Sequence, residues 1–292
     1  MNRFATFASA GLFVAVSGIA DAQQLYYTGF EPPLYPTSGS INNRDGWTTG
    51  TAFGISNGIS QTVAIGTQSL RFDNSASLNT RYSVKREMPP GIEDGFEVTA
   101  QVYIDGTTGE NRLYGVYLVD SPAGVLVNTT LGLTIDGGGR VRAGTDFDAT
   151  WDIFGIIDTA APGTFKDRWL TFTLTWTPTG GGEVEVSGFA APQEPISASF
   201  TLANAPQGLN LGTDRNEQVD RNGIGYFDEL FIEAVDAGCP ADLNGDGVVD
   251  ADDFFLFLQL FADGDPRADI NQDGVVDADD FFQYLNLFAQ GC

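Results

Sequence analysis

The sequence predicts a mainly β protein, in which an antiparallel two-sheet sandwich is followed by a small α-helical module. Three observations lead to this prediction. Apolar and polar residues alternate with period two in several runs before residue 235, glycine-rich turns separate the runs, and clear helical periodicity comes only after residue 239. The chain has 292 residues, of which 36 are glycine and 12% aromatic, a composition that suits short strands joined by tight turns.

The clearest alternation lies in residues 96–104 and 169–176. Phe96, Val98 and Ala100 alternate there with Glu97 and Thr99, as expected for strands with one buried face. Further strands are expected at residues 113–119, 125–135, 140–143, 183–189, 196–202 and 224–234. About ten to a dozen short antiparallel strands in roughly 210 residues predict a jelly-roll sandwich over residues 23–235.

The charge excludes several classes of function. The chain carries 14 Lys and Arg against 39 Asp and Glu, a net charge of −25, which repels nucleic acids and anionic lipid surfaces and attracts divalent cations. It contains no histidine, so Ser-His-Asp triads, histidine-ligated zinc and histidine general bases are excluded. Carboxylates, hydroxyls and the backbone are left to carry any chemistry.

The first 22 residues are expected to be a signal peptide rather than part of the fold. Arg3 precedes an apolar stretch at residues 4–19, and Ala20-Asp21-Ala22 has the small-x-small pattern of a cleavage site. The alternative is a membrane-anchoring helix, but the stretch is short for a span. A secreted protein, extracellular or attached to the cell surface, with no transmembrane anchor after cleavage, is therefore predicted.

Residues 236–292 are expected to form a calcium-binding module. Between Cys239 and Cys292 there are twelve Asp and one Arg, and two near-identical segments begin at Asp242 and Asp269, 27 residues apart. Each segment places oxygen ligands at positions 1, 3, 5, 7, 9 and 12 and a turn-forming glycine at position 6, which is the spacing of a twelve-residue calcium loop. An acidic surface with Asp-Gly turns is the alternative. The expected ligands of two calcium ions are Asp242, Asn244, Asp246, the Val248 carbonyl, Asp250 and Asp253, and Asp269, Asn271, Asp273, the Val275 carbonyl, Asp277 and Asp280.

These duplicated loops, each followed by one helix, resemble a type I dockerin. The Gly238-Cys239 start and the Gly291-Cys292 end resemble more narrowly the bacterial GC-type dockerin domain that ends secreted, anchored proteins. The resemblance implies docking to a cohesin-like or other envelope protein through residues 239–292. Loop positions 10 and 11 carry Ala-Asp in both copies instead of the Ser-Thr-like pair usual in such dockerins, so no known cohesin specificity is implied.

The helices expected at residues 254–261 and 281–288 are unusually apolar. Helical spacing places Phe254, Phe257, Leu258 and Phe261 on one stripe, which is expected to pack against Phe281, Tyr284, Leu285 and Phe288. Five large apolar residues remain outside these stripes, and a module of this size cannot bury them all. An exposed apolar patch that binds a partner is therefore expected, formed by Phe255, Leu256, Leu260, Phe282 and Leu287.

Cys239 and Cys292 are the only two cysteines, and they flank the duplicated loops. In a secreted protein they are expected to form an intramolecular disulfide. The alternative is a terminal thiol used for covalent attachment to the cell surface.

The sandwich region is similar to concanavalin A-like, LamG-type jelly rolls. Gly29-Phe30-Glu31 is expected to open the first strand, residues 67–72 resemble an early strand of that family, and residues 225–230 resemble its closing strand. The resemblance implies a fold, and suggests carbohydrate binding. Aromatic rings stack on sugar faces, and the candidates for this role are Trp47, Trp151, Trp176 and Tyr226, although each such ring can instead belong to the core.

Catalysis is the second hypothesis for the sandwich. Glu183 and Glu185 lie two residues apart on an expected strand and could supply the two carboxylates of a glycoside hydrolase. Solvent-facing alternation on an exposed strand explains the pair more simply, and a polysaccharide lyase would have to use Tyr, Lys or Arg as its base. The sequence thus favours a displayed carbohydrate-binding sandwich, with a docked glycoside hydrolase or lyase and a structural coat or adhesive protein as alternatives.

Overall fold

The computed structural model describes residues 23–35, 39–49, 57–60, 62–75, 82–93, 95–121, 129–145, 155–178, 181–202, 205–215, 220–235, 241–244, 248–271 and 274–290. These residues fall into two compact units, one within residues 22–237 and the other containing residues 238–292. Among the described residues, no helix is long and apolar enough to cross a membrane.

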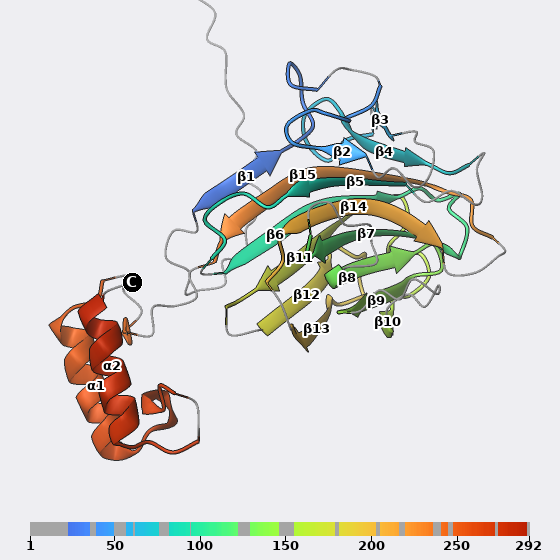
Figure 1. Cartoon of the computed structure of the whole chain (residues 1–292). Coiled ribbons are helices and arrows are strands. Elements are labelled where there is room, and N and C mark those ends of the chain that lie inside the picture. Colours follow the sequence, from blue (N-terminus) through green and yellow to red (C-terminus); the bar gives the residue numbers. More distant parts are fainter. Residues whose placement is uncertain are drawn as a thin grey trace, which may run out of the picture. The chain divides into compact units, whose positions relative to one another are not determined.

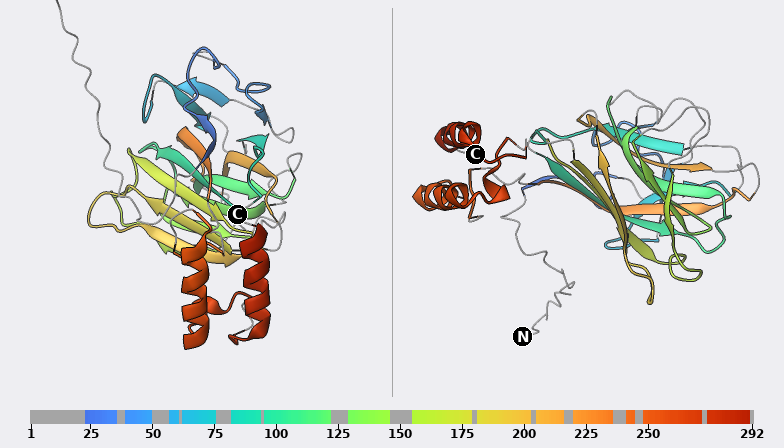
Figure 2. Two further views of the ribbon diagram at one scale, coloured as in Figure 1. Left: turned by 90° about the vertical axis from the view of Figure 1, so that its left-hand side faces the viewer. Right: turned by 90° about the horizontal axis from the view of Figure 1, so that it is seen from below.

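The larger unit is a sandwich of two antiparallel sheets, which form two layers of strands in Figure 1 and Figure 2. The eight-stranded sheet has the order β13-β12-β11-β6-β15-β4-β3, and β1 also pairs with β15. Its strands are β1 (Gln24–Thr28), β3 (Asn57–Ser60), β4 (Ser69–Asp73), β6 (Phe96–Ile104), β11 (Trp169–Trp176), β12 (Gly181–Ser187), β13 (Ile196–Thr201) and β15 (Ile224–Ala234).

The seven-stranded sheet has the order β10-β9-β8-β7-β14-β5-β2. Its strands are β2 (Thr48–Thr49), β5 (Tyr82–Glu87), β7 (Arg112–Val119), β8 (Thr129–Asp136), β9 (Arg140–Gly144), β10 (Ile156–Thr159) and β14 (Gly208–Arg215). A single hydrophobic core lies between the two sheets and takes side chains from both. The mainly β, two-sheet prediction is confirmed.

The expected alternation determines which side chains reach the core. Along β6 and β11 buried residues alternate with half-buried ones, so that Val98, Ala100, Phe172 and Leu174 face the other sheet. The first strand, however, ends before the Gly29-Phe30-Glu31 segment that was expected to open it. Phe30 has a φ of 58°, and its backbone N–H donates to the Thr28 hydroxyl, so the chain turns there instead of continuing a strand.

The smaller unit contains α1 (Ala251–Asp263), the short 3₁₀ helix η2 (Pro266–Ala268) and α2 (Ala278–Gln290). Asp250 caps α1 and forms a capping box with Asp253, and Gly264 ends the helix in the left-handed conformation. α1 and α2 lie side by side, and the rings of Phe257 and Tyr284 stack with centroids 3.9 Å apart.

The prediction of which α1 residues pack against α2 is wrong for Leu258 and Leu260. Leu260 is buried with Phe257 and Tyr284, whereas Leu258, which was expected in the packed stripe, is exposed. Phe255 and Phe282 remain exposed at 64% and 66%, as expected for two members of the apolar patch, while Leu256 and Leu287 are half-buried against the helical core. Phe254, Phe257 and Phe261 therefore stay in the packed stripe on α1, which extends to the side of Leu256 and Leu260 instead of the side of Leu258.

Candidate functional site

One face of the seven-stranded sheet carries polar side chains although it is largely shielded from solvent. Leu209 and Leu211 of β14 belong to the core, so Asn210 between them points to the opposite side of the sheet. The same alternation places the other non-core side chains on this side, and we call the set the polar face. Its polar members are Ser83, Lys85 and Glu87 on β5, Asn210 on β14, Tyr117 on β7, Thr130, Thr134 and Asp136 on β8, and Arg140 and Arg142 on β9.

The strand register arranges the centre of the polar face in two neighbouring rows. In the first row, Asn210 lies opposite Lys85 on one side and opposite Tyr117 on the other. In the second row, Thr134 lies opposite Arg142 on one side and opposite Gly115 on the other. An amide, a phenol, a hydroxyl and two cationic groups are thus brought together from five adjacent strands that are far apart in the sequence.

Glycines occupy the positions between these side chains. Gly132 lies opposite Tyr117 in the first row, and Gly212 lies opposite Gly115 in the second. At Gly115 the lack of a side chain is a packing requirement, because a Cβ there would lie 2.5 Å from the Thr134 methyl group and 2.6 Å from the Leu133 carbonyl oxygen. The rows therefore place backbone, and no further side chain of these strands, beside the Tyr117 side chain.

The centre of the polar face is shielded, and its edges reach solvent. All residues of β7 and β8 are buried, including Tyr117 and Thr134, and Asn210 is only 1% exposed. Lys85 is half-buried, and at the sheet edges Thr48 and Ile156 are exposed. Burying polar groups without hydrogen bonds costs free energy, whereas burying apolar groups in a core stabilises the fold. The shielding of this polar face is therefore not explained by hydrophobic packing.

Three oxygen atoms of the polar face have no hydrogen-bond partner among the residues that the structure describes. They are the Thr130 and Thr134 hydroxyl oxygens and the Asn210 side-chain carbonyl oxygen. A native protein leaves few such atoms, and an unpaired buried polar group costs about 1–3 kcal/mol. A polar molecule on this face would supply the missing partners.

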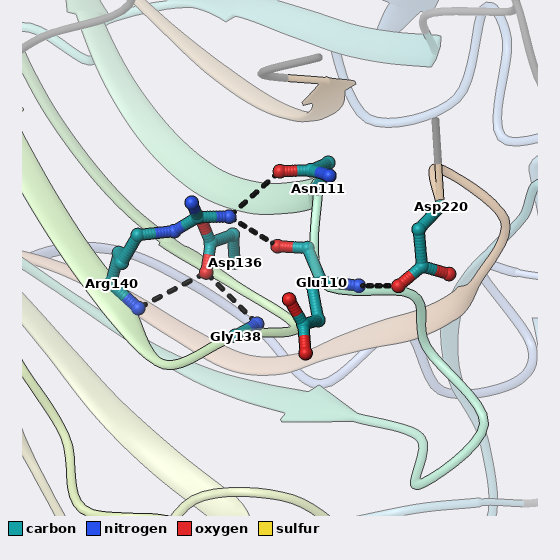
Figure 3. A network of polar contacts seen from close by, with 6 residues as sticks. All are labelled: Glu110, Asn111, Asp136, Gly138, Arg140 and Asp220. Carbon is teal, nitrogen blue, oxygen red and sulfur yellow. Dashed lines mark hydrogen bonds and ion pairs between the residues drawn. The ribbon is translucent and has the colours of Figure 1, made fainter. Parts of the chain in front are cut away.

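A tightly bonded network closes one end of the polar face (Figure 3). Asp136, at the end of β8, accepts hydrogen bonds from the Arg140 Nε at 2.6 Å and from the Gly138 N–H at 2.9 Å. Arg140 also donates through Nη2 to the Asn111 side chain at 2.8 Å and to the Glu110 carbonyl at 2.7 Å. Burial raises the pKa of Asp136, although the neighbouring Arg140 acts in the opposite direction. The Asp136–Arg140 ion pair connects the turn after β8 to residues 110 and 111, so we assign it a structural role.

Two of the aromatic residues proposed for sugar stacking lie in the core instead. Trp47 is fully buried, and its indole N–H donates to the Tyr26 hydroxyl at 3.1 Å. Trp176 is 6% exposed and packs against Phe96 with ring centroids 5.6 Å apart. Trp176 points inward on β11, and Trp47, in an isolated bridge just before β2, also has its ring in the core, so both follow the core alternative. Trp151 lies outside the described residues.

Tyr226, the remaining candidate, lies on the outer side of the eight-stranded sheet in an aromatic row. Its ring packs edge-on against Tyr103, which in turn packs against Trp169. The Trp169 indole N–H donates to the Val63 carbonyl at 3.0 Å, and the Tyr103 hydroxyl contacts Asp167 at 3.4 Å. The polar groups of these rings are thus used to hold loops, and Tyr226 is only 7% exposed. The row supports the loops rather than offering a flat platform.

Beside this row, two acidic side chains fasten residues 62–68 across the sheet. Asp228 accepts a hydrogen bond from the Ala64 N–H at 2.9 Å, and Glu31 accepts one from the Thr67 N–H at 2.6 Å. Burial raises the pKa of Asp228 to about 7, although backbone N–H donors act in the opposite direction. Asp228 precedes a β-bulge in β15, where Glu229 has a φ of 44°. Neither acid was expected from the sequence to have this role.

The Glu183 and Glu185 pair lies on the solvent side of β12. Glu183 is exposed and Glu185 half-buried, and their cross-strand neighbours on β11 are Thr175 and Thr173. This placement fits the solvent-facing explanation of the pair.

The two C-terminal loops share one hydrogen-bond pattern. Asp253 accepts from the N–H groups of Asn244 and Asp250, and Asp280 accepts from the equivalent groups of Asn271 and Asp277, all at 2.8–3.1 Å. Backbone donors hold the pKa of Asp280 below its usual value. In the second loop, the Gly274 N–H donates to Asp269 at 2.9 Å, and Gly274 has a φ of 91°. The carboxylate at position 12 of each loop is therefore hydrogen-bonded to the backbone of positions 3 and 9.

The described residues do not include the whole of either loop. Asp246 and Asp273, the expected fifth-position ligands, lie outside them, as do Cys239 and Cys292. In the part of the chain that the structure does describe, no three acidic, cysteine or histidine side chains gather closely enough to hold a metal ion.

Sequence reasoning did not find the polar face. Residues 113–119, 125–135 and 140–143 were expected to be strands, but β14 and β5 were not, so Asn210 and Lys85 had no expected neighbours. The one signal available was the alternation of Leu209 and Leu211 around a polar residue, flanked by glycines.

Comparisons with known proteins bear on the sandwich. No protein-family model matches the sequence, and no curated protein matches it. Among solved structures, the CBM2 module of the evolved Dit protein of Lactobacillus casei BL23 phage J-1 is similar with a TM-score of 0.51 and 11% identity, over 74% of this chain and 97% of that one. A conserved carbohydrate esterase from the Shiga toxin-encoding bacteriophage phi24B aligns with a TM-score of 0.46 and 14% identity, over 73% of this chain and 99% of that one. The endo-β-1,4-glucuronan lyase of Trichoderma reesei aligns with a TM-score of 0.45 and 10% identity, over 73% and 96%. The similarity to the CBM2 module shows that this module and the sandwich share a fold.

Proposed function

We propose that the sandwich binds polysaccharide through its polar face. The observation that carries this proposal is the group of shielded hydroxyl and amide oxygens on Thr130, Thr134 and Asn210 that lack hydrogen-bond partners in the described part of the chain. Sugars offer many hydroxyl groups, which donate and accept hydrogen bonds and could pair with these oxygens. The shared fold with a carbohydrate-binding module agrees with this proposal but does not by itself carry it.

The direct test is binding of the full chain to an array of plant, microbial and marine polysaccharides. Retention by at least one glycan class, and loss of that retention in an Asn210→Ala variant, are expected. Release of reducing ends or of unsaturated sugars from the bound polymer would instead assign an enzyme that acts at the same face. Failure to bind any glycan, together with firm retention on the cell envelope, would support the structural-coat alternative.

The C-terminal unit is proposed to bind two calcium ions and to dock the protein to an envelope partner. The duplicated loop spacing and the matched hydrogen-bond patterns of Asp253 and Asp280 support this. The proposed ligands are Asp242, Asn244, Asp246, Val248, Asp250 and Asp253 in the first loop, and Asp269, Asn271, Asp273, Val275, Asp277 and Asp280 in the second. Bound calcium would neutralise part of the acidic charge of the module.

Secretion and the state of the cysteines belong to the same proposal. Residues 1–22 are proposed to be removed on export, which sequencing of the mature N-terminus would check. Cys239 and Cys292 are proposed to form a disulfide, and two free thiols in the native secreted protein would contradict it.

A further inference from the structure

The eight-stranded sheet ends in a strand, β13, whose far edge no described strand covers. β13 is last in the order of this sheet and pairs with β12 alone (Figure 1). Among the residues that the structure describes, none outside β12 forms a hydrogen bond with the backbone of residues 196–201. Every second backbone N–H and C=O group of β13 therefore points away from the sheet, where another strand can pair with it.

β13 lacks the features that usually protect an edge strand from pairing. Native proteins keep such strands very short, or place charge, proline or a bulge in them. β13 has six residues, none of which is charged or proline, and its register with β12 is regular. The other described edge strands are shorter or irregular, because β2 has two residues and β3 has four, and the registers of β1 and β10 shift.

The side chains of β13 leave apolar surface uncovered at this edge. Ser197, Ser199 and Thr201 are exposed on the outer side of the sheet, whereas Ala198 and Phe200 pack against the core. Ala198 and Phe200 are only half-buried, although every core-side residue of the interior strands β6 and β11 is buried. A further strand paired with β13 would cover this apolar surface, and burying it would stabilise the contact.

We propose that β13 pairs with β13 of a second copy of this chain, so that the two eight-stranded sheets become continuous. A twofold axis perpendicular to the sheet makes the two strands antiparallel, and residues directly opposite each other then share one side of the sheet. With the axis at Ser199, this residue faces its own equivalent, Ser197 faces Thr201, and Ala198 faces Phe200. Hydroxyl groups thus meet hydroxyl groups and apolar groups meet apolar groups, which are favourable cross-strand pairs.

The charge of the chain favours this edge for contact between two copies. Each copy carries a net charge of −25, so two copies repel each other wherever acidic surfaces meet. β13 itself is uncharged, and Glu183 and Glu185 lie on the neighbouring strand β12. In the proposed pair the two copies of β12 are three strand spacings apart, or about 14 Å. This exceeds the screening length of about 8 Å at physiological ionic strength, so the repulsion between these glutamates is weak.

The test measures association of the full chain by sedimentation equilibrium over a series of concentrations. We expect a dimer for the wild type and equally for Phe255→Ser/Phe282→Ser, which removes the exposed phenylalanines of the helical unit. Amide hydrogen exchange of residues 196–201 should slow as the dimer forms. Ser199→Glu should raise the dissociation constant of the dimer by about tenfold or more, because it places like charges opposite each other at the axis, beside Glu183.

Two further variants separate the edge from a general effect of charge. Ser199→Lys alone should also associate weakly, whereas its mixture with Ser199→Glu should restore association, because opposite charges then meet at the axis. Thr171→Glu is the matched control, since it adds the same charge to the outer side of the same sheet, on β11, two strands from β13. It should leave the dissociation constant unchanged, and thermal unfolding shows that each variant is folded.

Three outcomes would overturn the inference. The first is a wild-type chain that stays monomeric at the highest concentration at which it is soluble. The second is association of folded Ser199→Glu that equals that of the wild type, which would place the contact on another surface. The third is equal weakening by Thr171→Glu, which would show that total charge alone governs association.

Discussion

Asn210 and Tyr117 lie directly opposite each other on β14 and β7, on the side of the sheet turned away from the core. Neither residue contributes to the sandwich core, although Asn210 is 1% exposed and Tyr117 fully shielded. A strand whose two faces are both shielded usually carries aliphatic residues on both. Polar residues at these positions therefore suggest a function that is separate from folding.

Stability and binding should respond differently to substitution on β14. Asn210→Ala removes a buried oxygen that has no partner, so we expect little change in the free energy of unfolding, together with weaker glycan binding. Leu211→Ala, one residue away on the core side, should cost about 2–5 kcal/mol. Urea unfolding and affinity electrophoresis of both variants check this. A strong loss of stability in Asn210→Ala would show that the residue serves the fold.

Asp228 should make the stability of the sandwich depend on pH. Its pKa of about 7 in the folded protein lies above the value of about 3.9 usual for an unfolded chain, so the native state binds this proton more tightly. The resulting stabilisation is present below about pH 4 and is lost as the pH rises towards about 7. We therefore expect the difference in Tm between wild type and Asp228→Asn to decrease from about pH 5 to about pH 8.

Asp73 on β4 provides the control of opposite sign. Its partial burial is outweighed by hydrogen bonds from Ser75 and by Arg71, which together hold the pKa of Asp73 below its usual value. Its stabilisation is present at neutral pH and lost in acid, so the Tm difference between wild type and Asp73→Asn should shrink as the pH falls. A difference for Asp228→Asn that stays constant with pH would show that Asp228 is ionised throughout this range.

Period-two alternation predicted the central strands, because their inward residues are apolar and their outward ones polar. β6 and β11 follow this pattern from end to end. β14 alternates leucine with glycine and asparagine, and glycine contributes no polarity signal, so a strand at the centre of its sheet was missed. Trp47 and Trp176 show a similar limit in predicting the site. Aromatic residues occur both in cores and in sugar-binding sites, and only the folded structure shows to which of the two each ring belongs.

The C-terminal loops were easier to predict than the sandwich site, because their ligands are close in sequence. Twelve residues contain all six proposed ligands of one ion, whereas the polar face gathers residues from Lys85 to Asn210. A site built across strands depends on pairings that no local pattern specifies. The position of Leu258 shows that even a helix face depends on its partner, since its helical spacing fits the stripe and its side chain is nevertheless exposed.

Calcium should bind to the full chain with a stoichiometry of two and should order the C-terminal unit. Asp253→Ala and Asp280→Ala remove the last ligand of one loop each, so each variant should retain a single site. Asp263→Ala, at the end of α1 and outside both loops, should retain both. Isothermal titration counts the sites, and helical circular dichroism should fall on adding chelator. No heat on titration and no effect of chelator would contradict the calcium proposal.

The exposed phenylalanines of the two helices should serve docking and not stability. Phe255 and Phe282 occupy equivalent positions of the duplicated segments and are 64% and 66% exposed, whereas Phe257 is fully buried against Tyr284. Phe257→Ala should therefore lower the free energy of unfolding by about 3–5 kcal/mol, while serine at either exposed position should change it by no more than about 0.5 kcal/mol.

Retention on envelope extract then separates docking from folding. The double variant Phe255→Ser/Phe282→Ser should lose calcium-dependent retention because it removes apolar area that a partner would cover. Leu34→Ser provides the control, since Leu34 is also a large exposed apolar residue, at 52%, but belongs to the sandwich unit. Retention of the folded double variant at the wild-type level would place the docking surface elsewhere, and equal loss in Leu34→Ser would show that the retention is unspecific adhesion of apolar surface.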